Sequence, residues 1–280
     1  MRHIAIIGAG DLGGAVAHAL ARGDLARAIT IVDDRGRIAA GKALDISQAA
    51  PVEGFAAQLD GATDVSAASG ADVVVVADRA GAGDWQGEDA LQLVRRIAQM
   101  ARAAIVVCAG APHREVVERA VVELKLDRRR VIGSAPEALA GAARALVALA
   151  LDGSPRDVAL TILGAPPHHV VLPWEEATYS GRSITGVLDE PARRRIDATI
   201  PALWPPGPQA LAAACAKVIA AIDGRVRQTA TCFVAVDGTS GTRWRTVALP
   251  VRLGSAGIVD VVLPALSVGE RVALDNAMVL

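Results

Sequence analysis

The stretch IAIIGAGDLGGAVAHAL, residues 4–20, decides the fold of this 280-residue chain. A short β-branched run is followed by Gly8, Gly10 and Gly13 in the spacing G-x-G-x-x-G, and a helical pattern rich in alanine and leucine follows directly. In this arrangement the first glycine allows a tight turn, the second lets the backbone approach a pyrophosphate, and the third allows close packing of helix against strand. The stretch therefore predicts a strand, a phosphate-binding turn and a helix whose positive end faces the ligand.

The next predicted strand adds a residue that is typical of a dinucleotide site. Asp33 lies at the end of the predicted strand in AITIVDD (28–34), twenty residues after Gly13, where a carboxylate accepts hydrogen bonds from an adenosine ribose. The same carboxylate would repel a 2′-phosphate, so we expect NAD rather than NADP as the cofactor. The predicted cofactor contacts are Gly8, Gly10, Asp11, Leu12, Gly13, Asp33 and Ala77. In the alternative interpretation the glycines only build a tight turn, and Asp33 is a solvated strand end.

Strand and helix patterns alternate from residue 3 to residue 133. The expected strands are HIAII (3–7), AITIV (28–32), DVVVVA (72–77), AIVVCA (104–109) and RVIG (130–133), and the expected helices lie near 12–22, 38–49, 88–101 and 113–124. Such alternation predicts right-handed βαβ crossovers and a doubly wound parallel sheet. We therefore expect an α/β protein whose residues 1–134 form the NAD-binding domain.

The pattern changes after residue 150, where strand-like segments come closer together. These segments are RDVALTIL (156–163), ATCFVAV (230–236), WRTVALPVRL (244–253) and GIVDVVL (257–263), with helices expected near 190–202 and 208–222. The intervening VDGTSGTRW (236–244) predicts a hairpin turn because it is rich in Gly, Ser and Asp. We expect residues 135–280 to form a mixed α+β domain that packs directly on the first.

Composition excludes several classes of function. Hydrophobic residues make up 52% of the chain, but charged residues such as Arg144 and Lys217 interrupt every apolar run of about eighteen residues, so no membrane span is predicted. A formal net charge of −1 favours neither nucleic acid nor an anionic membrane as a partner. Cys108, Cys215 and Cys232 are widely spaced, which predicts buried thiols without a disulfide framework or a metal site. The N-terminus lacks a signal-peptide pattern, so we expect a cytoplasmic protein.

Several segments together resemble the malate/lactate dehydrogenase family, in its lactate-dehydrogenase-like malate dehydrogenase branch. They are IAIIGAGDLGGAVAHAL, IVDD, GKALDISQAAPVEGF, ADVVVVA, RVIG, PRDVALTILG and VALPVRLGSAGI, and they fall in the family's order over both lobes. The resemblance implies an N-terminal Rossmann domain, a C-terminal domain that carries the substrate groups, NAD as cofactor, and oxidoreductase activity. It also implies a homodimer or homotetramer packed partly through the helix at GKALDISQAA.

The resemblance fails at the residues that carry the family's chemistry. That chemistry needs a histidine proton donor, an aspartate that orients it, and arginines that polarise the carbonyl and bind the carboxylate. Carried over residue by residue, the histidine falls on Pro166, the aspartate on Leu139, and the arginines on Gly81, Gly87 and Ala142. A positioned acid/base contributes about 10²–10⁴ in rate, and arginine supplies the strongest pairing for a carboxylate. We therefore expect no activity on malate or lactate, as in a pseudoenzyme.

Three residues remain as weak catalytic candidates. His168 falls two residues after Pro166, and it would act as a surrogate acid/base if the two prolines turned the loop inward; His169 would point the other way in an extended segment. Arg79, near the end of the VVVVA strand, could reach a cofactor or substrate. In the alternative interpretation all three are surface residues. The neighbouring Asp78 would disfavour an anionic substrate near the nicotinamide.

Three functional hypotheses stay open at this stage. The first is an NAD(H)-binding family member without malate or lactate dehydrogenase activity, acting as an NADH-responsive regulatory or partner subunit. The second is an active oxidoreductase on a less charged substrate, with His168 or His169 as the acid/base. The third is a structural oligomerisation module in which even the nucleotide is dispensable.

Overall fold

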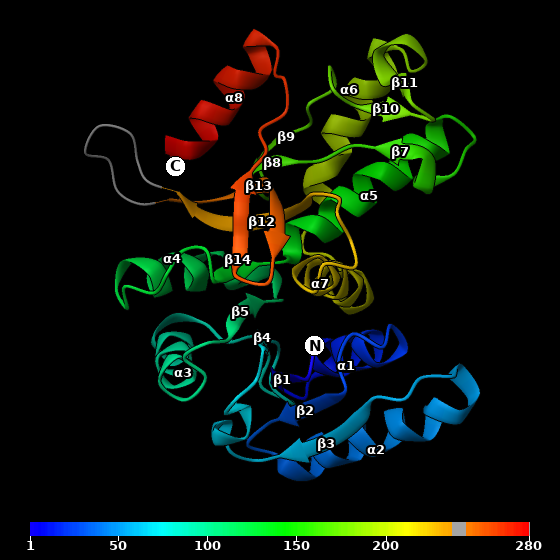
Figure 1. Cartoon of the computed structure of the whole chain (residues 1–280). Coiled ribbons are helices and arrows are strands. Elements are labelled where there is room, and N and C mark those ends of the chain that lie inside the picture. The colour runs from blue at the N-terminus through cyan, green and yellow to red at the C-terminus, as the bar shows by residue number, and fades with distance from the viewer. Residues whose placement is uncertain (237–244, 280) are drawn as a thin grey trace.

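One sheet of eleven strands runs through both halves of the chain within residues 1–236 and 245–279, the part that the computed structural model describes (Figure 1). The strand order is β3-β2-β1-β4-β5-β6-β12-β13-β8-β9, and β14 pairs with β13. The N-terminal strands, which are all parallel, are β1 (His3–Ile7), β2 (Ala28–Val32), β3 (Gln58–Ala62), β4 (Val73–Val76), β5 (Ile105–Cys108) and β6 (Val131–Gly133). This order, 3-2-1-4-5-6, confirms the predicted doubly wound sheet.

Helices cover both faces of this parallel sheet. They are α1 (Asp11–Arg22), α2 (Gly36–Glu53), α3 (Gly87–Met100) and α4 (Arg114–Val122). Alternate residues of β1 enter different cores: Ile4 and Ile6 pack on the side of α1 and α2, whereas Ala5 and Ile7 pack on the side of α3 and α4. Burial on both faces explains why the central strands are nearly continuous apolar runs.

Strand β3 is the N-terminal strand that the sequence pattern did not predict. Its sequence, QLDGA, is polar and only partly buried, and it pairs with β2 at the edge of the sheet. An edge strand of this kind shows neither an apolar run nor a clear alternation of apolar and polar residues, so its sequence does not predict a strand. It is a strand because it pairs with β2.

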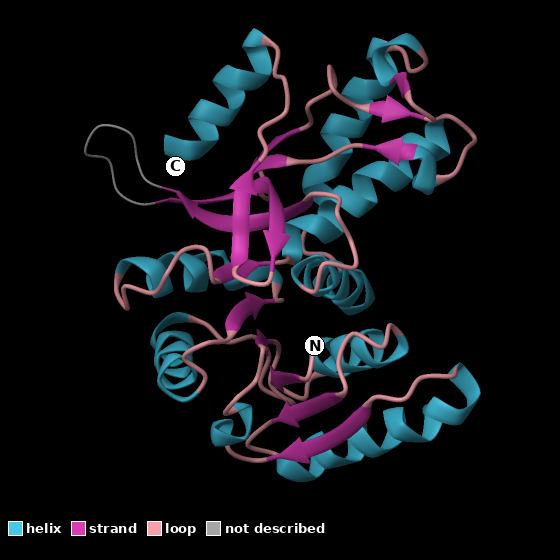
Figure 2. Cartoon of the chain, in the orientation of Figure 1, coloured by secondary structure: helices cyan, strands magenta, loops and turns pink. Residues whose placement is uncertain are grey.

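The C-terminal half extends the same sheet with antiparallel strands. Strand β12 (Ala230–Val236) joins β6 through the pair Phe233 and Gly133, and is followed across the sheet by β13 (Arg245–Gly254), β8 (Leu163–Ala165) and β9 (His169–Val171), with β14 (Gly257–Val261) on β13. Figure 2 shows the strands following one another from the N-terminal half at the bottom to the C-terminal half above it. The predicted turn at 236–244 falls on residues 237–244, which lie outside the described residues.

The remaining helices surround this extension. They are α5 (Ala135–Ala150), α6 (Glu190–Thr199), α7 (Pro208–Ile222) and α8 (Val268–Val279). Short 3₁₀ helices lie at Val65–Ala68, Ala111–His113, Pro155–Asp157, Ile184–Gly186 and Ile200–Leu203. Helix α7 packs against α1 and α5, so it joins the two halves of the chain.

The expectation of one strand over residues 156–163 is wrong. Strand β7 (Val158–Ala159) belongs to a separate small sheet with β10 (Thr178–Tyr179) and β11 (Arg182–Ser183), whereas β8 begins only at Leu163 in the large sheet. The apolar run at 156–163 is divided because the chain leaves the small sheet after β7 and enters the large sheet at β8, crossing between Leu160 and Ile162.

The described helices and the three cysteines bear on two predictions made from composition. Among the described helices, none combines the length and the apolar character needed to cross a bilayer. All three cysteines are free and buried, which confirms their predicted role as apolar thiols. Burial raises the pKa of the Cys108 and Cys215 thiols to about 12, so both stay protonated.

Candidate functional site

The glycine-rich turn joins β1 to α1 and lies against the end of β4. Gly8 has a φ of +117°, and a Cβ atom there would lie 2.2 Å from the carbonyl oxygen of Asp78. The N–H of Gly10 donates to that same carbonyl at 2.9 Å. Position 8 therefore requires glycine, because any side chain would clash with Asp78. The turn places the N-terminus of α1 at the carboxyl edge of the sheet. Leu12 and Ala77 are buried beside the turn, whereas Asp11 is exposed.

Asp33 lies at the end of β2 with its carboxylate already hydrogen-bonded. One oxygen accepts the backbone N–H groups of Ala9 at 2.8 Å and Ala80 at 2.9 Å, and the other accepts that of Arg35 at 2.9 Å. Burial, to 5% exposure, opposes ionisation, but the N–H groups of Ala80, Ala9 and Arg35 outweigh it and hold the pKa of Asp33 below its ordinary value. Asp33 is thus a buried carboxylate that ties the glycine-rich turn to the residues after β4.

Asp78 follows β4 and places its carboxylate directly over the glycine-rich turn. Its Oδ1 accepts the N–H of Gly13 at 2.9 Å, and a Cβ atom on Gly10 would lie 2.2 Å from its Oδ2. On the other side of the turn, Lys42 of α2 donates from Nζ to the carbonyl oxygen of Gly10 at 2.5 Å. The first turn of α1 therefore carries an internal carboxylate and a neighbouring ammonium group.

Residues 79–87 fold back beside Asp78 instead of extending away from the sheet. Arg79 and Gly83 form an isolated β-bridge, and the Arg79 guanidinium carbon lies 4.6 Å from the centre of the Trp85 ring. Gly81, Gly83 and Gly87 all have positive φ, which lets this short segment reverse its direction. The catalytic candidate Arg79 is thereby packed on an aromatic ring of its own loop.

His113 is the last residue of the 3₁₀ helix Ala111–His113, which follows β5, and its fully buried side chain faces this loop. Its Nδ1 accepts the N–H of Gly110 at 3.0 Å, and its Nε2 lies 3.7 Å from Oδ1 of Asp84. Burial lowers the pKa of His113 to about 4, so the ring is neutral with its proton on Nε2. Burial, and the charge of Asp78, raise the pKa of Asp84.

Replacing His113 with asparagine is expected to reduce the loss of stability in mild acid. Between about pH 6.5 and pH 4 the unfolded chain binds a proton that the folded chain excludes, so the free energy of unfolding falls by up to about 3 kcal/mol as the pH is lowered. Asparagine keeps an acceptor for the Gly110 N–H but does not titrate. Urea unfolding across this pH range measures the slope.

The control for this variant is His18→Asn, since His18 is a solvent-accessible side chain of α1 paired with Glu53. His18→Asn should lose more stability in mild acid than His113→Asn, because it keeps the buried His113. An unchanged slope in His113→Asn would show that His113 does not cause the acid sensitivity.

In the second lobe, the residues around Pro166 form the hairpin between β8 and β9. Pro166 is buried, and His168 and His169 are both exposed. His169 begins β9 and pairs with Ala165 across the hairpin. The two histidine candidates therefore lie on the surface of a hairpin that packs against α8.

The other four positions to which the resemblance assigns catalytic residues lie in the core, on α5 and in or next to the loop after β4. Leu139 is fully buried in the core between α5 and α6, and Ala142 is half-buried on α5. Gly81 lies in the loop after β4, next to the Arg35 guanidinium, and Gly87 is the first residue of α3. None of these four side chains carries a titratable group.

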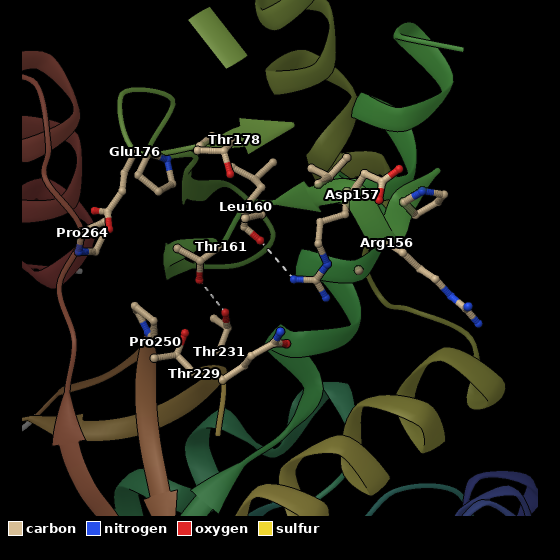
Figure 3. A pocket seen from close by; sticks show the side chains of 18 of the residues that line it. Arg156, Asp157, Leu160, Thr161, Glu176, Thr178, Thr229, Thr231, Pro250 and Pro264 are labelled. Atoms are coloured by element: carbon tan, nitrogen blue, oxygen red, sulfur yellow. Dashed lines mark hydrogen bonds between the residues drawn. The ribbon is translucent and has the colours of Figure 1, made fainter. Parts of the chain in front are cut away.

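A cavity of about 930 Å³ lies in the C-terminal half, away from the glycine-rich turn. Figure 3 shows Thr161, Thr229 and Thr231 grouped on one side, and Thr161 and Thr231 share a hydrogen bond of 2.7 Å. Its wall also includes Glu137, a residue of α5 that is 3% exposed. The carboxylate of Glu137 accepts hydrogen bonds from Arg144 Nη2 at 2.6 Å, Lys217 Nζ at 2.5 Å and the Thr231 N–H at 2.8 Å. Neither His168 nor His169 lines this cavity.

Comparison with known proteins identifies the family. The model for the NAD binding domain of lactate/malate dehydrogenases matches residues 2–133. A malate dehydrogenase of Thioalkalivibrio sulfidiphilus is 30% identical over 296 residues, covering 99% of this chain and 96% of that protein. The chain belongs to the lactate/malate dehydrogenase family. A malate dehydrogenase of Thermomicrobium roseum is 29% identical over 296 residues, with 99% and 94% coverage.

Solved structures of the family share the fold over nearly the whole chain. The malate dehydrogenase of Salinibacter ruber has a TM-score of 0.87 at 23% identity, covering 99% of this chain and 94% of that one. The malate dehydrogenase of Plasmodium falciparum has a TM-score of 0.89 at 20% identity, with 100% and 96% coverage. The predicted family, fold class and cofactor are confirmed at this level, since NAD is the cofactor of the matched domain.

The phosphate half of the site does not fit the dinucleotide in the conformation described. A pyrophosphate at the first turn of α1 would accept N–H groups such as that of Gly13, but Asp78 already accepts this group and lies against Gly10. At the ribose half, Asp33 keeps the carboxylate that the sequence predicts, but it is buried under the Ala80 N–H. A bound dinucleotide therefore requires Asp78 and its loop to move.

Sequence reasoning missed several residues of this region. Asp78 was noted for its charge but not for its position over the turn, and Lys42 and His113 were not selected at all. Glu137 was also missed, although a lone carboxylate among the apolar residues of APEALAGAARALVALA is a usable signal. Within the described residues, no group of three or more metal-ligating side chains comes together.

Proposed function

We propose that this chain is an NAD(H)-binding family member that does not turn over malate or lactate, and that acts as an NADH-responsive regulatory or partner subunit. One observation carries the proposal: the nucleotide turn and Asp33 are retained, whereas buried Pro166 stands where the resemblance places the proton donor. A proline side chain has no titratable atom, so no proton transfer is possible from this position.

The surroundings of Pro166 support the same conclusion about the substrate. Leu139 is embedded in an apolar core, so it cannot orient an acid/base or accept its charge. Arg144, a cation of the same helix, already pairs with Glu137 and donates to the Leu160 carbonyl at 3.0 Å. A dicarboxylate substrate would therefore find no uncommitted cation on α5 to replace the arginine that the resemblance places at Ala142.

The proposal includes a homodimer or homotetramer in the cytoplasm, with residues 1–134 as the nucleotide-binding domain and residues 135–280 as the second domain. Helix α2 supports the oligomer, because its side chains Leu44 and Val52 are 60% and 88% exposed. A subunit contact on this helix would bury both side chains. The resemblance places the subunit contact on this same helix.

The purified chain is expected to bind NADH but not to oxidise it with oxaloacetate or pyruvate. Because both the acid/base and the substrate-binding cations are absent, the rate should be at least about 10⁴-fold below that of a malate dehydrogenase relative assayed in parallel. Loss of NADH absorbance measures the rate, and calorimetric titration with NADH and NADPH measures binding. NADPH should not bind, because Asp33 would repel its 2′-phosphate.

Three other results of these assays would contradict the proposal or favour one of the two alternative functions. Turnover of oxaloacetate or pyruvate would contradict the proposal directly. Turnover of a less charged ketone that disappears in a His168→Asn/His169→Asn variant would indicate a surrogate acid/base. Failure to bind NADH at any accessible concentration would favour a structural oligomerisation module.

A further inference from the structure

The Asp78 side chain makes the contacts that a nucleotide phosphate makes in a dinucleotide-binding fold. Its Oδ1 accepts the Gly13 N–H at 2.9 Å in the first turn of α1. Its Oδ2 lies so close to Gly10 that a Cβ atom there would be 2.2 Å away, which is the close approach that the second glycine allows for a pyrophosphate. The carboxylate therefore uses both the free N–H and the missing side chain of the glycine-rich turn.

Electrostatics at this end of α1 favour an anion, and Asp78 is a built-in one. The N-terminus of a helix carries a partial positive charge that stabilises a nearby carboxylate as it stabilises a phosphate. Gly10 is the N-cap residue of α1 and contributes no side-chain cap. Lys42 adds an ammonium group at the Gly10 carbonyl. An internal carboxylate and an incoming pyrophosphate would thus compete for the same positive potential.

The residues after Asp78 occupy the ribose half of the same site. The Ala80 N–H donates to Asp33 Oδ2 at 2.9 Å, on the carboxylate that the sequence assigns to the adenosine ribose. The Arg79 N–H donates to the Gly83 carbonyl at 2.8 Å, which holds the loop in its folded-back form. One continuous stretch of chain therefore covers both halves of the nucleotide site.

Three buried side-chain N–H groups in or beside this loop make no hydrogen bond within the part of the chain that the structure describes. Arg79 Nε, Trp85 Nε1 and His113 Nε2 are buried and make no hydrogen bond to any described residue. Each such group has lost its hydrogen bonds to water without gaining another, which favours a rearrangement that returns it to water. The closed form is thus held by Asp78 and Asp33 against a cost at the rest of the loop.

We propose that residues 78–87 are an internal competitor of the dinucleotide, in which Asp78 takes the place of the pyrophosphate and NAD(H) binds only by displacing it. This inference rests on the proposed function, since it concerns the regulation of the same site. It makes the affinity for NADH depend on one side chain, which holds the Gly13 N–H in the first turn of α1. A partner or condition that holds the loop open would raise that affinity.

Calorimetric titration of three variants with NADH tests the inference. Asp78→Gly removes the carboxylate, Asp78→Asn keeps its size but removes its charge, and Asp89→Asn removes the same charge from an exposed position on α3. Because a charge-assisted contact must be broken in the wild type, Asp78→Gly should bind NADH at least about tenfold more tightly. Asp78→Asn should also bind more tightly than wild type, whereas Asp89→Asn should stay within about threefold of it.

The outcomes separate this inference from the proposed function. Tighter binding of NADH by the Asp78 variants than by wild type supports the inference. Equal, measurable affinities in wild type and both Asp78 variants would overturn the inference and leave the proposed function intact. Absence of binding in every correctly folded variant, checked by circular dichroism and thermal unfolding, would overturn both. An equal gain in Asp89→Asn would reduce the effect to net charge and overturn the specific role of Asp78.

Discussion

Replacing Glu137 with alanine is expected to lower the free energy of unfolding by about 3–5 kcal/mol. The carboxylate is buried and accepts hydrogen bonds from Arg144, Lys217 and the Thr231 N–H, so it joins α5, α7 and β12. Its removal leaves two cations and one buried N–H group without their shared acceptor. Equilibrium unfolding in urea, with the midpoint and the slope both fitted, measures the change.

Glu190→Ala is the matched control, because Glu190 pairs with Arg194 on the exposed surface of α6. That variant should lower the free energy of unfolding by no more than about 0.5 kcal/mol, because an exposed i,i+4 ion pair contributes no more than this. Glu137→Gln should fall between the two, since an amide keeps the volume and one acceptor but not the charge. Equal costs for Glu137→Ala and Glu190→Ala would contradict a structural role for the buried cluster.

Replacing Asp33 with alanine is expected to cost about 3 kcal/mol of unfolding free energy, the second largest effect. The N–H groups of Ala9, Ala80 and Arg35 lose their acceptor, and the first two are buried. The pKa of Asp33 lies below its ordinary value, so its stabilising contribution is present above the unfolded pKa, near 3.8. That contribution is lost as the pH falls through the lower, folded pKa.

The measurement compares wild type and Asp33→Ala by urea unfolding from neutral to acid pH. The difference in unfolding free energy should be largest near neutral pH and shrink below about pH 4. Asp60→Asn is the control, because Asp60 is exposed and its carboxylate accepts the Gly61 N–H at 2.8 Å. A difference that does not shrink in acid would contradict the assignment of the effect to the ionised carboxylate.

The N-terminal half could be predicted almost completely from local pattern. Strands β1 and β2 and helix α1 lie where β-branched runs and the glycine spacing place them, because both faces of the sheet are buried and only apolar residues satisfy that condition. The polar edge strand β3 was missed for the same reason. In the second half, the run at 156–163 divides between two sheets, which depends on partners far away in sequence.

The candidate site was predictable only in part. The positions of Gly8, Gly10 and Asp33 follow from a motif with a fixed spacing, so the turn and the acidic strand end were found. The carboxylate of Asp78 over Gly10, and the burial of His113 beside Asp84, depend on how the loop after β4 folds back on the sheet. No periodic pattern in the sequence predicts the path of that loop.

By itself, the sequence determined the doubly wound sheet, the glycine-rich turn and the choice of NAD, because each of these depends on short-range spacing or on burial of alternating residues. The family followed from the resemblance of several segments over both lobes. Only the tertiary structure decided what occupies the turn, what Asp33 binds, and where Glu137 finds its three partners. Apart from the contacts of Asp33 with Arg35 and of Glu137 with Arg144, those contacts join residues that are between 24 and 94 positions apart, such as Ala9 with Asp33 and Glu137 with Thr231. Interactions at such separations exist only after the chain has folded, since they depend on the packing of whole elements rather than on any local pattern.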